Sequence, residues 1–301
     1  MSPGGLKIFM KILLIDCSAL CYASAHTLRG LEQEDIDTGV IFGFLRQLRS
    51  LSQKFGSIDF VFCWDSKSSK RKEVFPEYKI KRGKKKKEDP ELAAIFAATY
   101  EQIKKLKEYV IPKIGFTNSF EQKGLEADDL MANIVLGYPN CIMVTNDEDM
   151  FQCLDDCDIW LPGKKKLITA SSFQTEYGIQ PHEWAEVKAI GGCGTDEVPG
   201  VPGVGAKTVC AYLNNTLPKR TKAGKSTKKY AAIVSKEGLA IAERNRPLVS
   251  LPHEDTKEIW LDDNILLSAK GFYEVCDKFG FISFTRGVDK QRWDLWLKGK
   301  L

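Results

Sequence analysis

Three short apolar runs that each lead into an aspartate constrain the fold of this chain more than any other feature. The first, KILLIDCSAL, contains Asp16; the second, DFVFCWDS, reaches Asp65; the third, NCIMVTNDED, reaches Asp147 and Asp149. Runs this short and this apolar are typical of strands buried on both faces. Segments with helical spacing, such as IFGFLRQLRSLSQKFG, separate them. Strands that alternate with helices predict an α/β fold with a mainly parallel sheet.

The pattern changes after about Pro181, where helical segments and Gly/Pro turns replace the strand–helix alternation. We therefore expect two regions, 10–180 and 181–301, with a boundary near residue 180. HEWAEVKAIGG and AKTVCAYLNN are predicted helices, and KRTKAGKSTKK, with six basic residues in eleven, is typical of a flexible, solvated linker. Near the C-terminus, an amphipathic pattern predicts helix packed on the core, with Trp293 and Trp296 buried.

Composition excludes several classes of protein. With 301 residues, 43% of them apolar, the chain can form a substantial core, and its net charge is only +4. The sequence has no run of 18 apolar residues for a membrane span and no clear secretory signal. Its nine cysteines and three histidines lack zinc-finger spacing, which favours reduced, buried thiols over structural zinc or a disulfide framework. We expect a cytoplasmic monomer.

Acidic residues follow the predicted strands and begin one predicted helix. Ligands of doubly wound sheets bind beyond the carboxyl ends of the strands, where Asp16, Asp65 and Asp147 are expected. In an extended segment Asp147 and Asp149 would point to the same side. The helix start GLEADDLMANIVLG adds Glu126, Asp128 and Asp129.

Taken singly, each of these acids is typical of a helix cap or of a carboxylate that complements a helix dipole. Taken together, so many carboxylates at one sheet edge would repel each other unless cations neutralise them. Carboxylate oxygens suit hard ions such as Mg²⁺ or Mn²⁺. Two such ions about 4 Å apart are the usual means of hydrolysing a phosphodiester. The set therefore predicts a two-metal site.

A basic run follows the second strand. Seven of the nine residues from Lys79 to Lys87 are basic, and Arg71 adds another charge. Such a run is most often a solvated surface, but beside an acidic metal site it would hold a polyanion through its phosphates. Tyr78 precedes the run and is a candidate either for stacking on a base or for core packing.

The segment GGCGTDEVPGVPGVGAKTV is rich in glycine and ends in Lys207 and Thr208. It approaches a P-loop pattern, but Ala206 intrudes before the lysine and a predicted helix precedes the segment, where a P-loop requires a strand. A helix–turn–helix fits better, because the turn and the following helix N-terminus would present N–H groups to a DNA phosphate.

These segments, taken in order, resemble the 5′-nuclease family of flap endonucleases, phage 5′→3′ exonucleases and the 5′-nuclease domains of bacterial DNA polymerases. The matching pieces are LLIDCSAL, FCWDSKSSKRKEVFPEYKIKR, GLEADDLMA, VTNDEDM and VKAIGGCGTDEVPGVPGVGAKTV, within residues 11–213. The resemblance implies a PIN-like α/β core followed by a helix–three-turn–helix DNA-binding module. It also implies Mg²⁺-dependent cleavage of DNA at 5′ ends, flaps or nicks, in a stand-alone phage or bacterial enzyme.

The resemblance also implies roles for particular residues. Phosphate handling falls to Arg71, Lys79 and Arg82. DNA contacts fall to Lys188 and to the turn, which in the family often holds a K⁺ ion. The expected metal ligands are Asp16, Asp65, Glu126, Asp128, Asp129, Asp147, Asp149 and Asp196. The further expected DNA-binding residues are Tyr78, Lys84, Lys85, Gly200, Gly203, Gly205, Lys207 and Thr208.

One position departs from the family pattern. Cys193 replaces a carboxylate of the second metal site, and Glu197 stands where asparagine is usual. A thiol is a poor ligand for Mg²⁺ and is mostly protonated at neutral pH. We expect the second ion to bind more weakly, unless Glu197 compensates.

Three other readings remain at this stage. A non-catalytic DNA-junction binder of the same fold would bind a 5′-flap without cutting it. A P-loop-like NTPase would turn over ATP. A PIN-type ribonuclease would prefer RNA, against which the predicted turn module argues.

Overall fold

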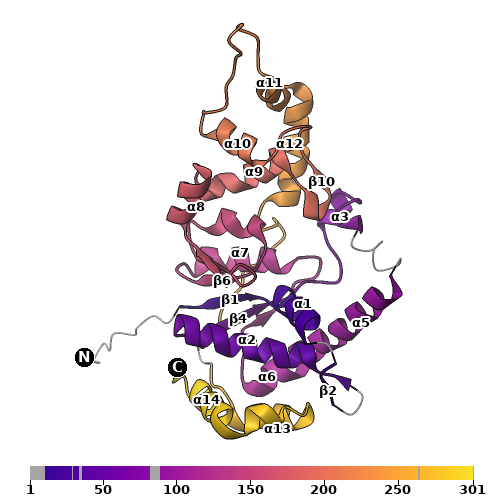
Figure 1. Cartoon of the computed structure of the whole chain (residues 1–301), viewed down its shortest axis with the longest axis vertical. Helices are drawn as coiled ribbons and strands as arrows, with labels where there is room; N and C mark the ends of the chain where they lie inside the picture. Colours follow the sequence, from indigo (N-terminus) through magenta and orange to yellow (C-terminus); the bar gives the residue numbers. More distant parts are fainter. Residues whose placement is uncertain (1–10, 29, 34–35, 82–88, 264, 301) are drawn as a thin grey trace, which may run out of the picture.

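The computed structural model describes residues 11–28, 30–33, 36–81, 89–263 and 265–300. A six-stranded sheet lies across the middle of an elongated molecule, in the order β5-β4-β1-β6-β7-β8 (Figure 1). Only the pairing of β7 with β8 is antiparallel, so the predicted mainly parallel α/β fold is confirmed. The strands are β1 (Leu13–Asp16), β4 (Phe60–Cys63), β5 (Ser119–Phe120), β6 (Ile142–Val144), β7 (Asp158–Leu161) and β8 (Lys166–Ile168).

The three predicted strands are neighbours at the centre of the sheet. Leu14 of β1 lies between Val61 of β4 and Met143 of β6, and all three belong to one core cluster. Leu13 and Ile15 point to the other face and belong to a second cluster, as the alternation of side chains along a strand requires. Because the three strands are parallel, their carboxyl ends lie at one edge of the sheet.

Helices cover both faces of the sheet. The long helix α2 (Gly39–Phe55) buries Ile41, Phe44 and Leu48 at helical spacing and ends at Gly56 in the left-handed conformation. On the same core lie α1 (Cys17–Thr27), α5 (Pro90–Lys105), its π-helical continuation η1 (Leu106–Val110) and α6 (Ile111–Ile114). The other face is covered by α7 (Ala127–Gly137). Short elements β2 (Glu32–Gln33), β3 (Ile36–Asp37) and α3 (Arg71–Val74) complete this part.

A helical region rises beyond the carboxyl ends of the strands (Figure 1). There α9 is joined to α10 by the glycine-rich turn, and α12 packs along α9. Asn245 of α12 ties this arrangement together, since its Nδ2 donates to the carbonyls of Ala189 (2.8 Å) and Pro199 (3.0 Å). The elements are η2 (Glu148–Cys153), α8 (Ala170–Tyr177), η3 (Pro181–Glu183), α9 (Trp184–Gly191), β9 (Gly192–Cys193), η4 (Gly194–Asp196), β10 (Val198–Pro199), α10 (Ala206–Leu213), α11 (Lys228–Val234) and α12 (Lys236–Val249).

The basic segment between α10 and α11 differs from the predicted flexible linker. Arg220 and Ser226 form an antiparallel bridge, and Thr227 N–H donates to the carbonyl of Lys219 at 3.1 Å. The segment is a folded hairpin, because local backbone hydrogen bonds compensate for its lack of apolar side chains.

The C-terminal helices do not belong to that region. The helices α13 (Ala269–Lys278) and α14 (Gly287–Leu297), with η5 (Ile282–Thr285), lie at the opposite end of the molecule (Figure 1). They join the core cluster of α2, where Trp293 and Trp296 are buried as predicted. Residues 181–301 are therefore divided between the two ends of the molecule. None of the described helices is long and apolar enough to cross a membrane, and all nine cysteines are free and buried.

Candidate metal centre

Asp16 ends β1 and begins the site. Its Oδ1 caps α1 by accepting from Ala19 N–H (2.9 Å), and its Oδ2 accepts from the Thr145 hydroxyl (2.8 Å), which follows β6. Burial and the nearby Asp65 carboxylate raise the pKa of Asp16 from 3.8 to about 7. A carboxyl group held half-protonated at neutral pH is one that a cation would stabilise in its charged form.

Asp65 and Asp128 approach the same point from β4 and α7. Asp65 Oδ1 accepts from Ala127 N–H at 2.9 Å, which orients the carboxylate at the start of α7. Burial, with Asp147 and Asp16 nearby, raises the pKa of Asp128 well above its ordinary value. These mutual effects show that Asp16, Asp65, Asp128 and Asp147 form one cluster at the sheet edge, as the sequence predicted.

Asp147 and Asp149 are not part of an extended segment. Asp147 caps the 3₁₀ helix η2 and accepts from Asp149 N–H at 2.8 Å. The expected strand-like alternation is therefore wrong, because the chain turns at Asp147 to begin this helix. Both carboxylates still join the site, and burial together with Asp149 raises the pKa of Asp147 to about 6.

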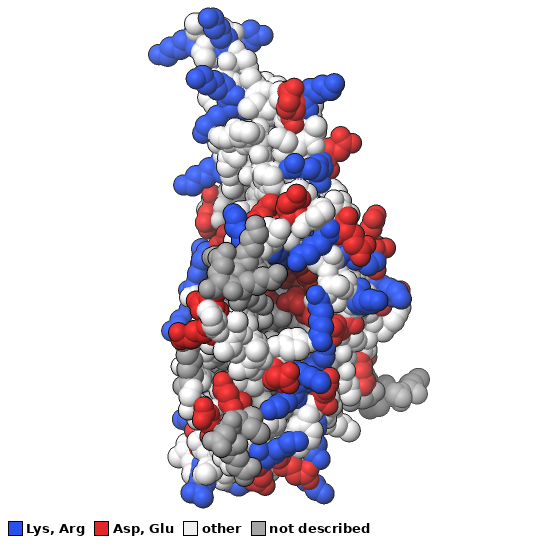
Figure 2. Space-filling model, turned by 90° about the vertical axis from the view of Figure 1, so that its right-hand side faces the viewer, with Lys and Arg blue, Asp and Glu red and all other residues white. Residues whose placement is uncertain are grey.

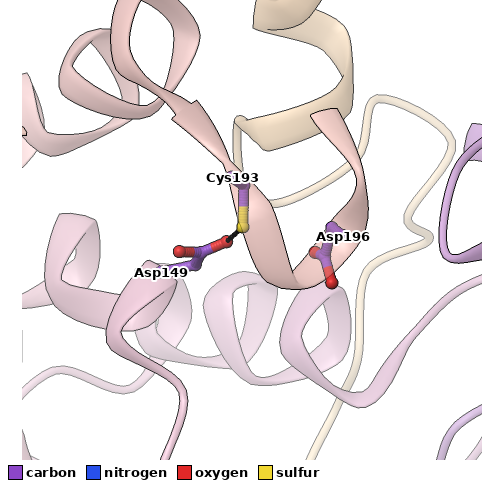
Figure 3. A group of neighbouring side chains, drawn as sticks. All are labelled: Asp149, Cys193 and Asp196. Carbon is purple, nitrogen blue, oxygen red and sulfur yellow. Dashed lines mark hydrogen bonds between the residues drawn. The ribbon is translucent and has the colours of Figure 1, made fainter. Parts of the chain in front are cut away.

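A second group lies beside the first (Figure 3). Ligand atoms of Asp149, Cys193 and Asp196 all lie within 4.8 Å of one another. The Cys193 thiol lies 3.5 Å from Asp149 Oδ2 and 3.1 Å from the Thr195 hydroxyl. Burial, Asp149 and Asp196 raise the pKa of Cys193 to about 11, so the thiol is protonated at neutral pH.

Two lysines supply positive charge to these acids. Lys79 Nζ lies 2.7 Å from Glu126 Oε2 and 3.6 Å from Asp196 Oδ1, and Lys188 Nζ lies 2.5 Å from Asp149 Oδ1. Burial opposes the charge on each lysine, but the neighbouring carboxylates outweigh it and raise the pKa of both. The backbone of Lys79 is left-handed, with φ of 53°, and its N–H donates to the Asp196 carbonyl at 3.0 Å.

Of the two roles considered for Tyr78, the structure shows core packing. Its ring is buried, so it is not available to stack on a base in this structure. Its hydroxyl donates toward Glu126 Oε2 (3.1 Å) and Asp196 Oδ2 (3.2 Å) and so bridges the two groups of acids. The sequence analysis did not predict this bridging role. The one signal for it was the position of Tyr78 directly before Lys79.

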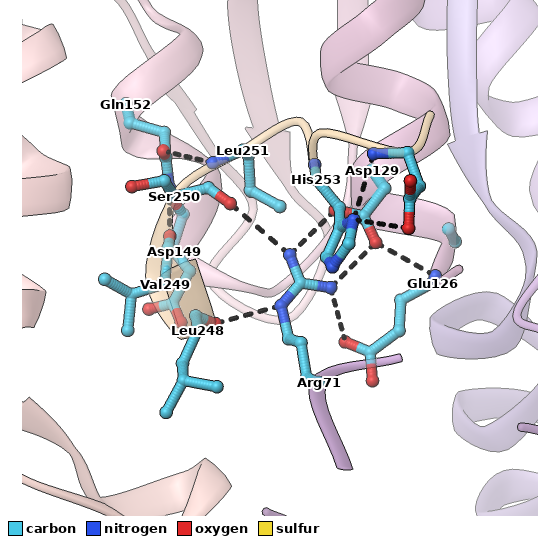
Figure 4. A network of polar contacts seen from close by, with 12 residues as sticks. Arg71, Glu126, Asp129, Asp149, Gln152, Leu248, Val249, Ser250, Leu251 and His253 are labelled. Atoms are coloured by element: carbon cyan, nitrogen blue, oxygen red, sulfur yellow. Dashed lines mark hydrogen bonds and ion pairs between the residues drawn. The ribbon is translucent and has the colours of Figure 1, made fainter. Parts of the chain in front are cut away.

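Arg71 and Asp129 are paired with each other next to the cluster, since Arg71 Nη1 also lies 3.9 Å from Glu126 Oε2 (Figure 4). Arg71 Nη1 and Nη2 each donate to an Asp129 oxygen at 2.7 Å, and Arg71 Nε donates to the Leu248 carbonyl at 2.9 Å. Backbone N–H groups of Glu126 and His253 also donate to Asp129. Burial would raise the pKa of Asp129, but Arg71 lowers it below its ordinary value.

This pairing corrects two expectations. Arg71 is 3% exposed and Asp129 is 0% exposed. Both oxygens of Asp129 accept protein donors, so it is not positioned as a metal ligand. Arg71 is equally engaged and cannot reach a scissile phosphate without breaking this network.

Arg82, Lys84 and Lys85 lie outside the described residues, so the structure does not place them. Glu197 does not compensate for Cys193 in this structure, since its Oε2 accepts from Lys81 N–H at 3.3 Å.

The glycine-rich turn is shaped by close backbone contact. A Cβ at Gly200 would lie 2.2 Å from the carbonyl carbon of Gly191, so only glycine fits there. Gly203 has φ of 74°, and a Cβ at Gly203 or Gly205 would meet no atom within 4 Å. Gly205 is the N-cap residue of α10. Because it has no side chain, it offers no side-chain acceptor to the N–H groups of the first turn. Lys207 is exposed and Thr208 half-buried beside it.

The surface matches this arrangement. Acidic side chains line a hollow at mid-height on the face shown in Figure 2, and Lys and Arg side chains lie around it. The same view shows Lys and Arg side chains covering the end formed by the α10–α11 connection. The donors of the cluster are carboxylate oxygens and one thiol, a set that fits hard divalent ions well at all positions except Cys193.

The strand order, the acidic sheet edge and the helical region define a PIN-like α/β fold. A family model described as "5′-3′ exonuclease, N-terminal resolvase-like domain" matches residues 11–178. The chain belongs to this 5′-3′ exonuclease family.

Known relatives agree with this assignment. The chain is 30% identical over 212 residues to a 5′-3′ exonuclease of Bacillus subtilis, covering 66% of this chain and 68% of that protein. It is 31% identical over 211 residues to a thermostable DNA polymerase I of Thermus aquaticus, covering 67% of this chain and 24% of the polymerase.

Solved structures share the fold. The 5′-exonuclease of bacteriophage T5, with bound zinc ions, has a TM-score of 0.65 and 22% identity, covering 80% of this chain and 90% of that chain. The catalytic core of Rad2, in complex with a DNA substrate, has a TM-score of 0.53 and 15% identity, covering 96% and 92%.

Proposed function

We propose that this protein is a metal-dependent, structure-specific 5′-nuclease that hydrolyses phosphodiester bonds of DNA at or near a 5′ end. The observation that carries the proposal is the cluster of carboxylates from β1, β4, α7 and η2, paired with two lysines at the edge of the sheet. Relatives named 5′-3′ exonuclease support the substrate end and the polarity.

The acids would hold two Mg²⁺ or Mn²⁺ ions. Asp16, Asp65, Glu126, Asp128 and Asp147 form the first site, and Asp149 and Asp196 form the second with Cys193. Bound ions would lower the pKa of a coordinated water to near neutrality and so supply the hydroxide nucleophile. A protonated thiol is a poor donor to Mg²⁺, so we expect the second site to be the weaker one.

The residues of this chain position and neutralise the scissile phosphate. Lys79 and Lys188 pair with Glu126 and Asp149. With Glu126 and Asp149 engaged as metal ligands, each ammonium would be available to a phosphate oxygen, where it would offset charge that develops during the reaction. Arg82 remains a proposed partner of Lys79 in this role. The products would be a 5′-phosphate and a 3′-hydroxyl.

The turn between α9 and α10 would hold the duplex. Gly200, Gly203, Gly205, Lys207 and Thr208 would grip the backbone through N–H groups and one ammonium, without reading bases. The carbonyl groups of this turn are a proposed K⁺ site. Lys84 and Lys85 are proposed to add phosphate contacts near the cluster.

A 5′-labelled flap, a nicked duplex and a blunt duplex, incubated with Mg²⁺, test this function. We expect short 5′ products from the flap, and we expect Asp147→Asn to lower the rate on the order of 10²- to 10³-fold because one ligand is weakened. DNA binding by the variant should stay within about twofold of the wild type, since Asp147 is not placed to contact duplex. Wild-type cleavage by Asp147→Asn would refute the site, and binding without cleavage by the wild type would favour a junction binder of the same fold.

A further inference from the structure

The hairpin between α10 and α11 lies in the middle of a long segment that contains basic residues and no acidic ones. Between Glu197 and Glu237 the sequence has no Asp or Glu but has eight Lys or Arg residues. The chain as a whole has a net charge of +4, so the remainder carries −4. Six of the eight cluster at the hairpin and the start of α11: Lys219, Arg220, Lys222, Lys225, Lys228 and Lys229.

Hydrogen bonds hold these charges in a defined place. Thr221 N–H donates to the Lys225 carbonyl at 2.7 Å, and Gly224 N–H donates to the Thr221 carbonyl at 2.9 Å. The Arg220 guanidinium donates to the Gly224 carbonyl at 3.0 Å, across the tip. Gly224 has φ of 75°, which a tight turn requires. The lysines are therefore displayed on a folded scaffold.

The base of the hairpin is attached to α10. Lys229 Nζ donates to the Thr208 hydroxyl at 3.2 Å, and the rings of Tyr212 and Tyr230 lie 6.0 Å apart. Thr208 belongs to the first turn of α10, which follows the glycine-rich turn. The basic hairpin is thus continuous with the surface proposed above to hold DNA.

The contacts of the hairpin account for only part of its charge: Arg220 holds the tip, and Lys219 Nζ lies 6.0 Å from the centre of the Tyr230 ring. Its residues from 218 to 226 are exposed, and it contributes no side chain to the buried core. Within the described part of the chain, none of Lys219, Lys222 and Lys225 pairs with a carboxylate. Crowded like charges repel each other, and a polyanion would relieve that repulsion.

We propose that this hairpin is a second duplex contact, which binds phosphates of the DNA beyond the segment held by the α9–α10 turn. This inference rests on the proposed function, because it takes the duplex of that substrate as the ligand. If α10 and the hairpin both follow the duplex axis, α10 covers roughly 12 Å of it and four extended residues of the hairpin cover roughly 13 Å more. At 3.4 Å per base pair, the contact would need a duplex about 8 base pairs longer than the turn alone requires.

The test compares duplex lengths. The triple variant Lys219→Gln, Lys222→Gln and Lys225→Gln keeps Arg220, which holds the tip together. The matched control is Lys270→Gln, Arg292→Gln and Lys298→Gln, which removes the same charge from exposed positions at the opposite end of the molecule. Binding to flap DNAs with duplexes of about 8 and about 24 base pairs is measured without divalent ions over a range of KCl concentrations.

On the long duplex we expect the triple variant to bind about 10- to 100-fold more weakly. We also expect the negative slope of log K against log salt concentration to become shallower by about 2 to 3. On the short duplex, and for the control variant on either DNA, we expect wild-type values. An unchanged slope on the long duplex, or an equal loss on both lengths, would overturn the proposal. Because this readout needs no cleavage, a wild-type protein that binds but does not cut would count against the nuclease function and leave the hairpin result valid.

Discussion

Two ion pairs at the start of α7 show how similar residues come to serve different purposes. Arg71 and Asp129 are almost fully buried, and four hydrogen bonds from three residues occupy both oxygens of Asp129. Lys79 and Glu126 are each 15% exposed, and the hydrogen bonds from Tyr78 and Lys79 both go to the same oxygen, Oε2. The first pair is structural: Arg71 of α3 donates to the Leu248 carbonyl, and Asp129 of α7 accepts from His253 N–H in the segment after α12. The second pair lies in the acidic cluster, where an incoming cation can replace the lysine.

Removing the buried pair should give the largest effect. Arg71→Gln leaves Asp129 charged and without its bidentate partner, so we expect the free energy of unfolding to fall by about 3–5 kcal/mol in urea titrations. Arg71→Lys keeps the charge but loses the planar fork, and should be intermediate. A loss below about 1 kcal/mol for Arg71→Gln would show that the pair is not a structural link.

Removing the exchangeable pair should affect activity more than stability. Lys79→Met should lower flap cleavage about 10²-fold, because charge on the phosphate is no longer offset. Any stability lost without metal should return when Mg²⁺ is added, since the ions replace the missing charge. Thermal melts with and without Mg²⁺, run beside Arg71→Gln, separate the pairs. Equal rescue of both variants would contradict the comparison.

The acidic cluster should make the metal-free protein less stable as pH rises. The pKa of Asp16 is raised from 3.8 to about 7 and that of Asp147 to about 6, so the folded state binds more protons than the unfolded state between about pH 4 and pH 7. Stability contributed by this protonation is present at low pH and lost across that window. We expect a decrease of about 4 kcal/mol between pH 5 and pH 7.5 in EDTA, since each pH unit between the unfolded and folded pKa of a group changes the stability by about 1.4 kcal/mol.

Two controls accompany the pH measurement. Asp16→Asn should flatten the dependence, because it removes a carboxyl whose pKa is raised to about 7. Saturating Mg²⁺ should also flatten it, since metal binding requires the ionised carboxylates. A stability that rises over this pH range in EDTA would argue against a crowded cluster.

The smallest effect concerns the second group of acids. Cys193→Asp replaces a protonated thiol with a carboxylate beside Asp149 and Asp196, so we expect the weaker Mn²⁺ ion to bind about 10-fold more tightly. Titration of free Mn²⁺ by electron paramagnetic resonance measures this without relying on cleavage. Cys193→Ser, which adds no charge, is the control. Unchanged Mn²⁺ affinity in Cys193→Asp would reject the proposed weakness of that site.

Much of the fold was predictable because its signals are local. Buried strands at Leu13, Phe60 and Ile142 show as apolar runs, and parallel neighbours bring Asp16, Asp65 and Asp147 to one edge. The burial of Trp293 and Trp296 was predictable from the amphipathic pattern.

What could not be predicted depends on contacts between distant residues. Arg71 is held by the Leu248 carbonyl, 177 positions away, and the sequence gives no sign of that contact. Asp128 and Asp129 look alike in sequence, but consecutive helix residues point about 100° apart around the axis, which directs the first into the cluster and the second to Arg71. The hairpin was mistaken for a linker because backbone hydrogen bonds leave no mark on composition.

The return of the chain to the far end of the molecule has a practical consequence. Phe272, Trp293 and Trp296 share a core with Phe44 of α2 and with Phe60 of β4, the strand that leads to Asp65. A shortened version that stops after α12 would expose this aromatic layer to water. The two last helices are therefore part of the structural support of the sheet, although they lie far from the acidic cluster in the chain.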